Sequence, residues 1–188
     1  MEKTYSLVIH PPEPILALVK SMKEQLAAEV GWFNSKNSVG HITICEFKAT
    51  EKGIENIKNQ ILKICDTLSP VEVYLNEFGS FPKNGAFFIA PDNDSKKSLK
   101  NIMKRFHKSL LIPNMLKSDN PHLSIARRLS SENLIKANQL LFTEIDLHFV
   151  CDRVVLRQFD EKIKQFFVID TFEFKGNPEP ELVQGKLF

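Results

Sequence analysis

The first half of the chain alternates between short apolar runs and stretches with helical spacing. Residues 5–10 (YSLVIH) form an apolar, β-branched run that two prolines end, which predicts a strand. Apolar side chains then recur every three or four positions between Pro14 and Gly31, which predicts an amphipathic helix over 14–30. The same patterns next predict a strand at HITICEF (41–47), a helix over 53–68 and an alternating strand at VEVYLNEF (71–78).

The second half begins the same order again. Asn84-Gly85, a strong signal for a two-residue hairpin turn, leads into the apolar strand AFFIAP (86–91). The pattern then predicts a helix over 95–111, a strand at HLSIAR (122–127) and a short helix over 131–141. Three predicted strands follow, which are EIDLHFV (144–150), DRVVLRQF (152–159) and FFVIDTFEF (166–174).

The two halves place equivalent features at matching distances. Pro11 and Pro91, which end the first strand of each half, precede His41 and His122 by 41 − 11 = 30 and 122 − 91 = 31 residues. A period of about 80 residues is too long for a solenoid repeat. We therefore expect one domain over residues 1–174, made of two interleaved lobes (internal repeat at about 5–82 and 86–174) related by a pseudo-twofold axis. The proline- and glycine-rich tail, 175–188, is expected to be loose.

Composition adds a few limits to this picture. A chain of 188 residues with 43% hydrophobic and 26% charged side chains is typical of a soluble globular protein. The net charge of +2 does not favour a broad nucleic-acid-coating surface, although a local basic cleft is compatible with it. The three cysteines lie in apolar runs, which predicts buried free thiols. No run approaches the roughly 20 apolar residues that span a bilayer, and no secretion signal is evident. We expect a cytoplasmic monomer without membrane contact.

Two stretches at equivalent places in the halves share one pattern. His41-Ile42-Thr43-Ile44 and His122-Leu123-Ser124-Ile125 each set an imidazole two residues before a hydroxyl. Strand alternation predicts that His41, Thr43, Cys45 and Phe47 share one face, and that His122, Ser124 and Ala126 share the corresponding face. A twofold relation would then bring two imidazoles and two hydroxyls together across a cleft.

A tetrahedral phosphodiester is a substrate that uses such a set of side chains. One imidazole can take a proton from the attacking water or hydroxyl, and the other can give a proton to the leaving oxygen. The hydroxyls can donate hydrogen bonds to the non-bridging oxygens. This chemistry needs no metal and no cofactor. Each histidine alone is more typical of a packing residue, so the repetition of the motif is what favours a functional pair.

The paired motifs resemble those of the two-histidine (2H) phosphoesterases, also called LigT-like or 2'-5' RNA ligase family proteins. The resemblance rests on HITI (41–44) and HLSIAR (122–127) and extends over roughly residues 5–174. It implies an α+β, two-lobed fold with an antiparallel sheet in each lobe, helices outside and the active site in the central cleft. It also implies a hydrolase or ligase that acts on RNA-type phosphodiesters, commonly 2',3'-cyclic phosphates or 2'-5' links, without metal.

Carried over by position, the resemblance assigns roles to five residues. His41 and His122 would be the acid/base pair, with Thr43 and Ser124 as phosphate ligands. Arg127 matches an arginine that often continues the second motif, but alternation points it away from Ser124, so it reaches a phosphate only if the strand bulges. The choice between acid and base, and between hydrolysis and ligation, stays open.

Other residues have two interpretations each. Phe47 is a possible substrate contact that could stack on a base, or it is a core residue. Arg153 and Arg157 could line a phosphate-binding wall or face water, and His10 could border the cleft or be structural. The expected partner is RNA or a nucleotide cyclic phosphate. The alternative function is a non-catalytic RNA- or nucleotide-binding module that uses the same cleft.

Overall fold

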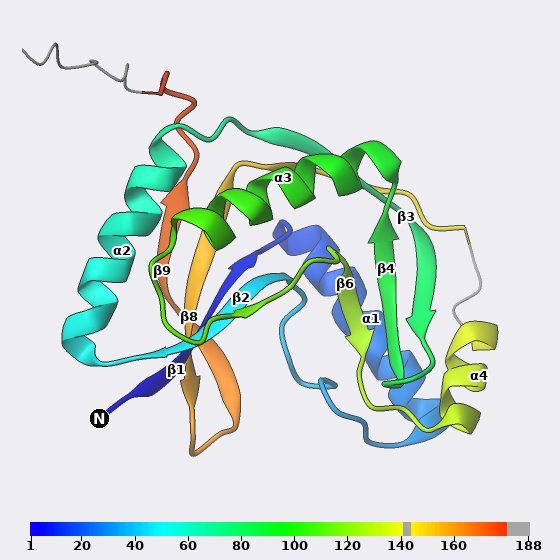
Figure 1. Cartoon of the computed structure of the whole chain (residues 1–188). Coiled ribbons are helices and arrows are strands. Elements are labelled where there is room, and N and C mark those ends of the chain that lie inside the picture. Colours follow the sequence, from blue (N-terminus) through cyan, green and yellow to red (C-terminus); the bar gives the residue numbers. More distant parts are fainter. Residues whose placement is uncertain (141–143, 180–188) are drawn as a thin grey trace, which may run out of the picture.

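The computed structural model describes residues 1–140 and 144–179, which form two antiparallel sheets and four helices (Figure 1). The five-stranded sheet has the order β5-β2-β1-β8-β9 and the four-stranded sheet the order β6-β4-β3-β7. The strands are β1 Lys3–Ile9, β2 Ile42–Ala49, β3 Val71–Phe81, β4 Ala86–Pro91, β5 Leu116–Lys117, β6 Leu123–Ala126, β7 Leu147–Cys151, β8 Arg153–Asp160 and β9 Gln165–Glu173. The helices are α1 Glu13–Val30, α2 Glu51–Asp66, α3 Asn93–Ser109 and α4 Ser131–Leu140.

This architecture confirms the predicted α+β fold with two lobes. Helices α2 and α3 start two residues before their predicted starts because side chains cap them there. Thr50 Oγ1 accepts a hydrogen bond from Gly53 N (3.1 Å), so α2 begins at Glu51. Asp92 caps α3 in the same way through Ser95 N (2.7 Å). The short strand β5 has no counterpart among the predicted elements.

The Asn84-Gly85 hairpin is present with a longer turn than its sequence predicts. Strands β3 and β4 pair antiparallel, but Phe81 and Ala86 form the last pair, so the loop has the four residues 82–85. Gly85 adopts a φ of +63°, and an added Cβ would lie 2.1 Å from the backbone oxygen of Leu129. Glycine is therefore required here both for the turn and for the close approach of a second loop.

Each sheet contains strands from both halves of the chain. The first-half strand β3 lies in the four-stranded sheet, whereas the C-terminal hairpin β8–β9 completes the five-stranded sheet. The result is symmetric, since β1 lies between β2 and β8 while β4 lies between β6 and β3. The two histidine motifs thus occupy equivalent strands, with β2 at one side of β1 and β6 at one side of β4.

The helices cover the faces of the sheets that form the core. Helix α2 packs against β2 and β9, α3 contacts both sheets, and α1 and α4 pack together over the four-stranded sheet (Figure 1). The three cysteines are buried free thiols, as predicted, and burial raises the pKa of each to about 12. Within the described ranges, none of the helices has the length and apolar character needed to cross a bilayer.

The start of the tail is held against α2. The backbone N–H groups of Lys175, Gly176 and Asn177 donate to the carbonyls of Cys65, Leu68 and Asp66. The expectation of a loose tail therefore does not describe this part of the segment. Residues 180–188 lie outside the described residues.

Candidate active site

The two motif histidines are held by the same hydrogen bond. His41 Nδ1 lies 2.6 Å from the Val39 carbonyl oxygen, and His122 Nδ1 lies 2.7 Å from the Asn120 carbonyl oxygen. A carbonyl oxygen only accepts, so Nδ1 carries the proton in both rings. The Nε2 atom of each neutral imidazole is then an unprotonated acceptor. Both rings are partly exposed, so both Nε2 atoms are available to a substrate.

A β-bulge follows the hydroxyl residue in β2. Thr43 pairs with Val8 and Cys45 pairs with Leu7, although Val8 and Leu7 are adjacent in β1 and point to opposite faces. Ile44 is therefore an extra residue, and Thr43 and Cys45 lie on opposite faces of the sheet. The prediction that Thr43 and Cys45 share one face is wrong for this reason.

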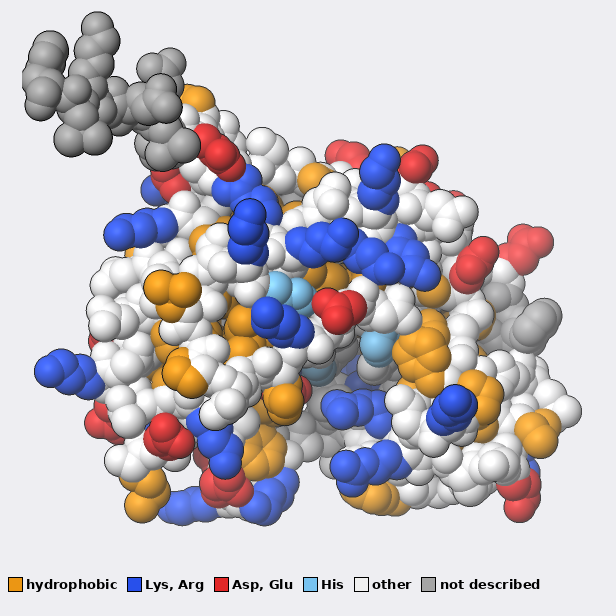
Figure 2. All heavy atoms as spheres, in the orientation of Figure 1, with side chains coloured by type: hydrophobic (Ala, Val, Ile, Leu, Met, Phe, Trp, Pro, Cys, Tyr) orange, Lys and Arg blue, Asp and Glu red, His pale blue; other side chains and the backbone are white. Residues whose placement is uncertain are grey.

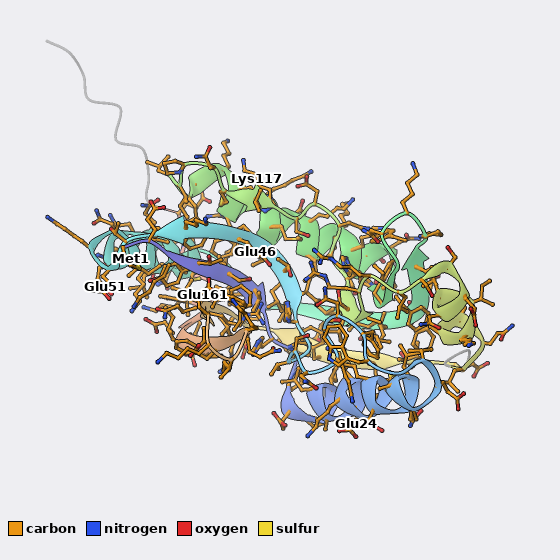
Figure 3. The ribbon with its side chains drawn as sticks, turned by 90° about the horizontal axis from the view of Figure 1, so that it is seen from below. Met1, Glu24, Glu46, Glu51, Lys117 and Glu161 are labelled. Atoms are coloured by element: carbon orange, nitrogen blue, oxygen red, sulfur yellow. The ribbon has the colours of Figure 1, made fainter. Side chains whose placement is uncertain are left out.

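Strand β6 carries the same bulge at the equivalent place. Ser124 pairs with Phe88 and Ala126 with Phe87, so Ile125 is the extra residue. Because Ala126 points away from the Ser124 face, the next residue, Arg127, returns to that face. The condition under which Arg127 could reach a phosphate is thus met. Glu46 occupies the place on β2 that corresponds to Arg127. Figure 3 labels Glu46 and also Lys117 of β5, the edge strand that pairs with β2.

The bulge also removes Phe47 from the site. Phe47 pairs with Tyr5, lies on the face opposite Thr43, and is 3% exposed. Its ring stacks on Tyr5 with the centroids 5.8 Å apart. The expectation that Phe47 contacts the substrate is therefore wrong, and the core interpretation holds.

The carbonyl groups of both bulged residues have hydrogen-bond donors. Ile44 O accepts from His107 Nε2 at 2.8 Å and from Ser118 N at 3.0 Å. Ile125 O accepts from Ser35 Oγ at 3.4 Å. Since an unpaired buried carbonyl is costly, these donors stabilise the two irregular strands. His107 has a structural role in this arrangement.

Each histidine follows a segment that runs along the motif strand of the other lobe. Strand β5 and Ser118, which precede His122, pair with β2. The segment 34–40, which precedes His41, bridges to Arg127 at one end, and at its other end an added Cβ on Gly40 would lie 3.4 Å from Leu123 Cδ1. This reciprocal crossing brings the starts of β2 and β6 close together.

Lys23 of α1 fixes the segment that leads to His41. Its side chain is 2% exposed, and Nζ donates to Ser35 O (3.0 Å), Ser38 O (2.7 Å) and Ser38 Oγ (3.1 Å). Burial lowers the pKa of Lys23 to about 8. The ammonium group thus satisfies two loop carbonyls just before Val39, whose own carbonyl holds the His41 ring.

Burial and nearby arginines lower the pKa of both motif histidines. For His41 the pKa lies well below its ordinary value, first because of burial and then because of the Arg157 charge. Burial also lowers the pKa of His122, and the Arg127 charge adds to that effect. In each case the bond to a backbone carbonyl favours the protonated ring and opposes the shift. Both imidazoles are therefore neutral at neutral pH in the free protein.

Arg157 of β8 lies on the same face as Thr43. Ser6 pairs with both Glu46 and Arg157, so these three side chains share a face with Val8 and its partner Thr43. Arg157 is 3% exposed and donates from Nη2 to Ser6 Oγ at 3.2 Å. Arg153, by contrast, is exposed and forms an ion pair with Asp152 at 2.7 Å. Strand alternation in the sequence assigns Arg153 and Arg157 to the same face. The structure distinguishes them by their partners, which are Asp152 for Arg153 and Ser6 for Arg157.

Two phenylalanines flank His122. The Phe88 and His122 rings have centroids 4.7 Å apart, and Phe81 meets His122 edge-on at 5.6 Å. Gly79 makes room for this cluster, since an added Cβ would lie 2.5 Å from Phe88 Cε2. A glycine within a strand is a signal for such close approach, and it could have drawn attention to Phe88. Figure 2 shows a central hollow with histidine side chains and Lys or Arg side chains around it.

Comparisons with solved structures identify this fold as LigT-like. Escherichia coli LigT in complex with NADP+ superimposes with a TM-score of 0.66 at 8% identity, covering 93% of this chain and 99% of LigT. TT0787 of Thermus thermophilus gives a TM-score of 0.64 at 16% identity, with 93% and 100% covered. Usb1 of Kluyveromyces marxianus gives 0.52 at 12% identity, with 91% and 98% covered. These likenesses concern the fold.

The family follows from the sequence itself. The model of the 2'-5' RNA ligase superfamily matches residues 10–162, which include both histidine motifs. The chain belongs to the 2'-5' RNA ligase superfamily, and the resemblance noted from the motifs is confirmed. A search among curated proteins gives no match.

Proposed function

We propose that the protein is a metal-independent phosphodiesterase that acts on RNA ends or nucleotides, of the 2',3'-cyclic phosphodiesterase or 2'-5' RNA ligase-like type. His41 and His122 would be its general acid/base pair. The observation that carries this proposal is the matched pair of Nδ1–carbonyl bonds, which leave Nε2 of both rings for a substrate. Two imidazoles prepared alike for proton transfer suit an in-line displacement at phosphorus.

In the proposed reaction, the two rings exchange protons with opposite sides of the phosphodiester. One neutral Nε2 accepts the proton of the attacking water or hydroxyl as the new P–O bond forms. The other ring, protonated on Nε2, donates its proton to the leaving oxygen as the old P–O bond breaks. When the attacking group is a hydroxyl of a second nucleotide in place of water, the step joins the two nucleotides, and in the reverse of this transfer the two roles exchange.

Three further groups would bind the non-bridging oxygens. The Thr43 and Ser124 hydroxyls lie two residues after the histidines, and the bulge in β6 returns Arg127 to the Ser124 face. Hydroxyl and guanidinium donors stabilise the charge that accumulates on these oxygens in the transition state. Solved structures of E. coli LigT hold 3'-AMP, ATP and NADP+, which supports a nucleotide-type ligand for this chain.

The alternative is a module that binds RNA or a nucleotide without turnover. Binding alone does not require two titratable rings with equivalent hydrogen bonds, so the matched geometry favours the enzyme. Tight RNA binding, with no turnover of 2',3'-cyclic, 1'',2''-cyclic or 2'-5' substrates, would instead support the binding module.

Alanine variants of the two histidines test the enzyme directly. On a substrate found by a screen of cyclic phosphates and 2'-5' oligonucleotides, H41A and H122A should each lose about 10²- to 10⁴-fold in kcat, as expected for lost general acid/base catalysis. The control is H148A, because His148 is exposed on β7. Activity should survive a chelator. Full activity in both H41A and H122A would rule out the mechanism, and loss of activity on chelation would indicate a metal enzyme.

A further inference from the structure

Arg157 is a buried cation without an anionic partner. Its side chain is 3% exposed, and its Nε atom is buried with no hydrogen-bond partner. Among the described residues, its one hydrogen bond goes from Nη2 to the neutral Ser6 Oγ, and no carboxylate forms an ion pair with it. Glu46, across Ser6, is the acidic group that acts on Arg157 through its charge. Buried charges are normally paired, so this guanidinium has unused capacity for an anion.

His10 adds a second unpartnered polar atom at the same place. His10 directly follows β1, and alternation puts it on the face of Ser6 and Val8. Its Nε2 is buried and has no hydrogen-bond partner. The charge of Arg157 lowers the pKa of both His10 and His41, so all three groups lie near one another. Arg157 and His10 can both donate a hydrogen bond to an oxyanion that bridges them.

The symmetry of the sheets places this cluster beside the reacting centre. Ser6 pairs with Arg157 in one sheet, and Ala86 pairs with Phe81 at the equivalent place in the other. Arg157 therefore has the position relative to His41 that Phe81 has relative to His122. Since Phe81 lies at the edge of the His122 ring, the symmetry puts Arg157 beside His41, and its charge lowers the pKa of that ring.

The flanks of the two histidines consequently differ in chemistry. The flank of His122 has the aromatic rings of Phe81 and Phe88. The flank of His41 has a guanidinium that stacks on Phe166 (5.0 Å to the ring centroid) and an imidazole. The charge of Arg127 also acts on His122, but Arg127 would bind the reacting phosphate, so a second anionic group of the ligand would be stabilised at the His41 flank.

We propose that Arg157 and His10 form an anion-binding subsite beside His41, which takes a second phosphate group of the substrate next to the phosphodiester that reacts. This inference rests on the proposed function. The substrate class is a nucleotide with two separate phosphate groups, of which a nucleoside 2',3'-cyclic phosphate with a 5'-phosphate is the simplest. The Arg157 guanidinium orients such a substrate in one direction along the cleft.

A matched pair of substrates tests the subsite. Adenosine 2',3'-cyclic phosphate is compared with the same compound bearing a 5'-phosphate, in the wild type, R157Q, R157K, H10Q and the control R153Q. The wild type should prefer the 5'-phosphorylated compound by about 10- to 100-fold in kcat/KM, the range expected for charge-assisted hydrogen bonds. The preference should fall to about one in R157Q and be intermediate in R157K and H10Q. It should be unchanged in R153Q.

Two results would overturn the subsite. If R157Q keeps the preference for the 5'-phosphorylated compound, Arg157 does not bind the second phosphate. An equal loss of kcat/KM on both substrates in R157Q would show that Arg157 acts on the reacting phosphate or on the fold. Circular dichroism and the conservative variant R157K distinguish these two roles.

Failure of the proposed function is distinguishable from failure of the subsite. If neither substrate is turned over, isothermal titration with adenosine 3',5'-bisphosphate and with 3'-AMP replaces the kinetics. The wild type should bind the bisphosphate more tightly than 3'-AMP, and R157Q should bind the two alike. Equal affinities in the wild type would contradict the subsite.

Discussion

The proposed mechanism requires the two motif imidazoles to differ in protonation. Burial lowers the pKa of both, and Arg157 and Arg127 add to the effect on His41 and His122 respectively. In that mechanism the free protein would be competent when one ring is neutral and the other is protonated. As the pH falls, the base becomes protonated, and as it rises, the acid loses its proton. Activity is therefore greatest between the two pKa values, which belong to the coupled pair.

We predict a bell-shaped profile of kcat/KM whose maximum lies below about pH 6.5, the ordinary pKa of histidine. In the enzyme–substrate complex, the phosphate charge favours the imidazolium, so the profile of kcat should be displaced to higher pH. Initial rates between pH 4 and 9 in constant ionic strength measure both profiles. A maximum of kcat/KM above about pH 6.5, or a profile that does not change with pH, would contradict lowered pKa values in the free enzyme.

Strand alternation predicts which residues form β2 and β6, but it does not predict the bulge in each strand. A period-two pattern has no signal for one extra residue, because the apolar Ile44 and Ile125 are buried whichever face they take. The pattern therefore assigns Thr43 and Ser124 correctly to the two strands, but it begins each strand one residue early, at His41 and His122, and places Phe47 on the wrong face. It also leaves Arg127 undecided. The bulge depends on donors from distant segments, among them His107 and Ser35.

The segment before β2 depends on Lys23 of α1. In K23M the apolar stem is kept, but the Ser38 carbonyl loses its donor, whereas Ser35 O keeps Ser38 N and Ser38 Oγ as donors. Each unsatisfied carbonyl costs about 1–3 kcal/mol. We expect a fall of that order in the free energy of unfolding by urea, and a fall of about 10-fold in kcat as the support of the His41 ring loosens. The control is K20M, because Lys20 is an exposed lysine of the same helix. Wild-type stability and kcat in K23M would show that this anchor is dispensable.

The exchange of strands between the halves gives the whole molecule its symmetry. The repeat in the sequence predicts two similar lobes, and the Asn84-Gly85 signal predicts that β3 pairs with β4, but neither predicts the remaining partners, such as β8 beside β1 and β7 beside β3. Such partners depend on long-range pairing, which local periodicity does not encode. Arg157 shows the consequence, since its place beside His41 depends on the pairing of β8 with β1.

The segments before His41 and His122 cross reciprocally between the lobes. Each histidine follows a segment that pairs with the motif strand of the other lobe, so each half of the candidate site is held by contacts from the other lobe. The proposed mechanism requires that the two Nε2 atoms converge on one phosphate. A titration of the protein with inorganic phosphate, followed by ¹⁵N NMR of the imidazoles, measures this convergence.

The resonances of His41 and His122 should move together with one dissociation constant. The pKa of both rings should rise, because a bound anion favours the imidazolium. Nδ1 should remain protonated throughout, as its carbonyl partners require. The exposed His148 should not respond. A response from one ring alone, or from the two rings with different dissociation constants, would contradict a single phosphate site between them.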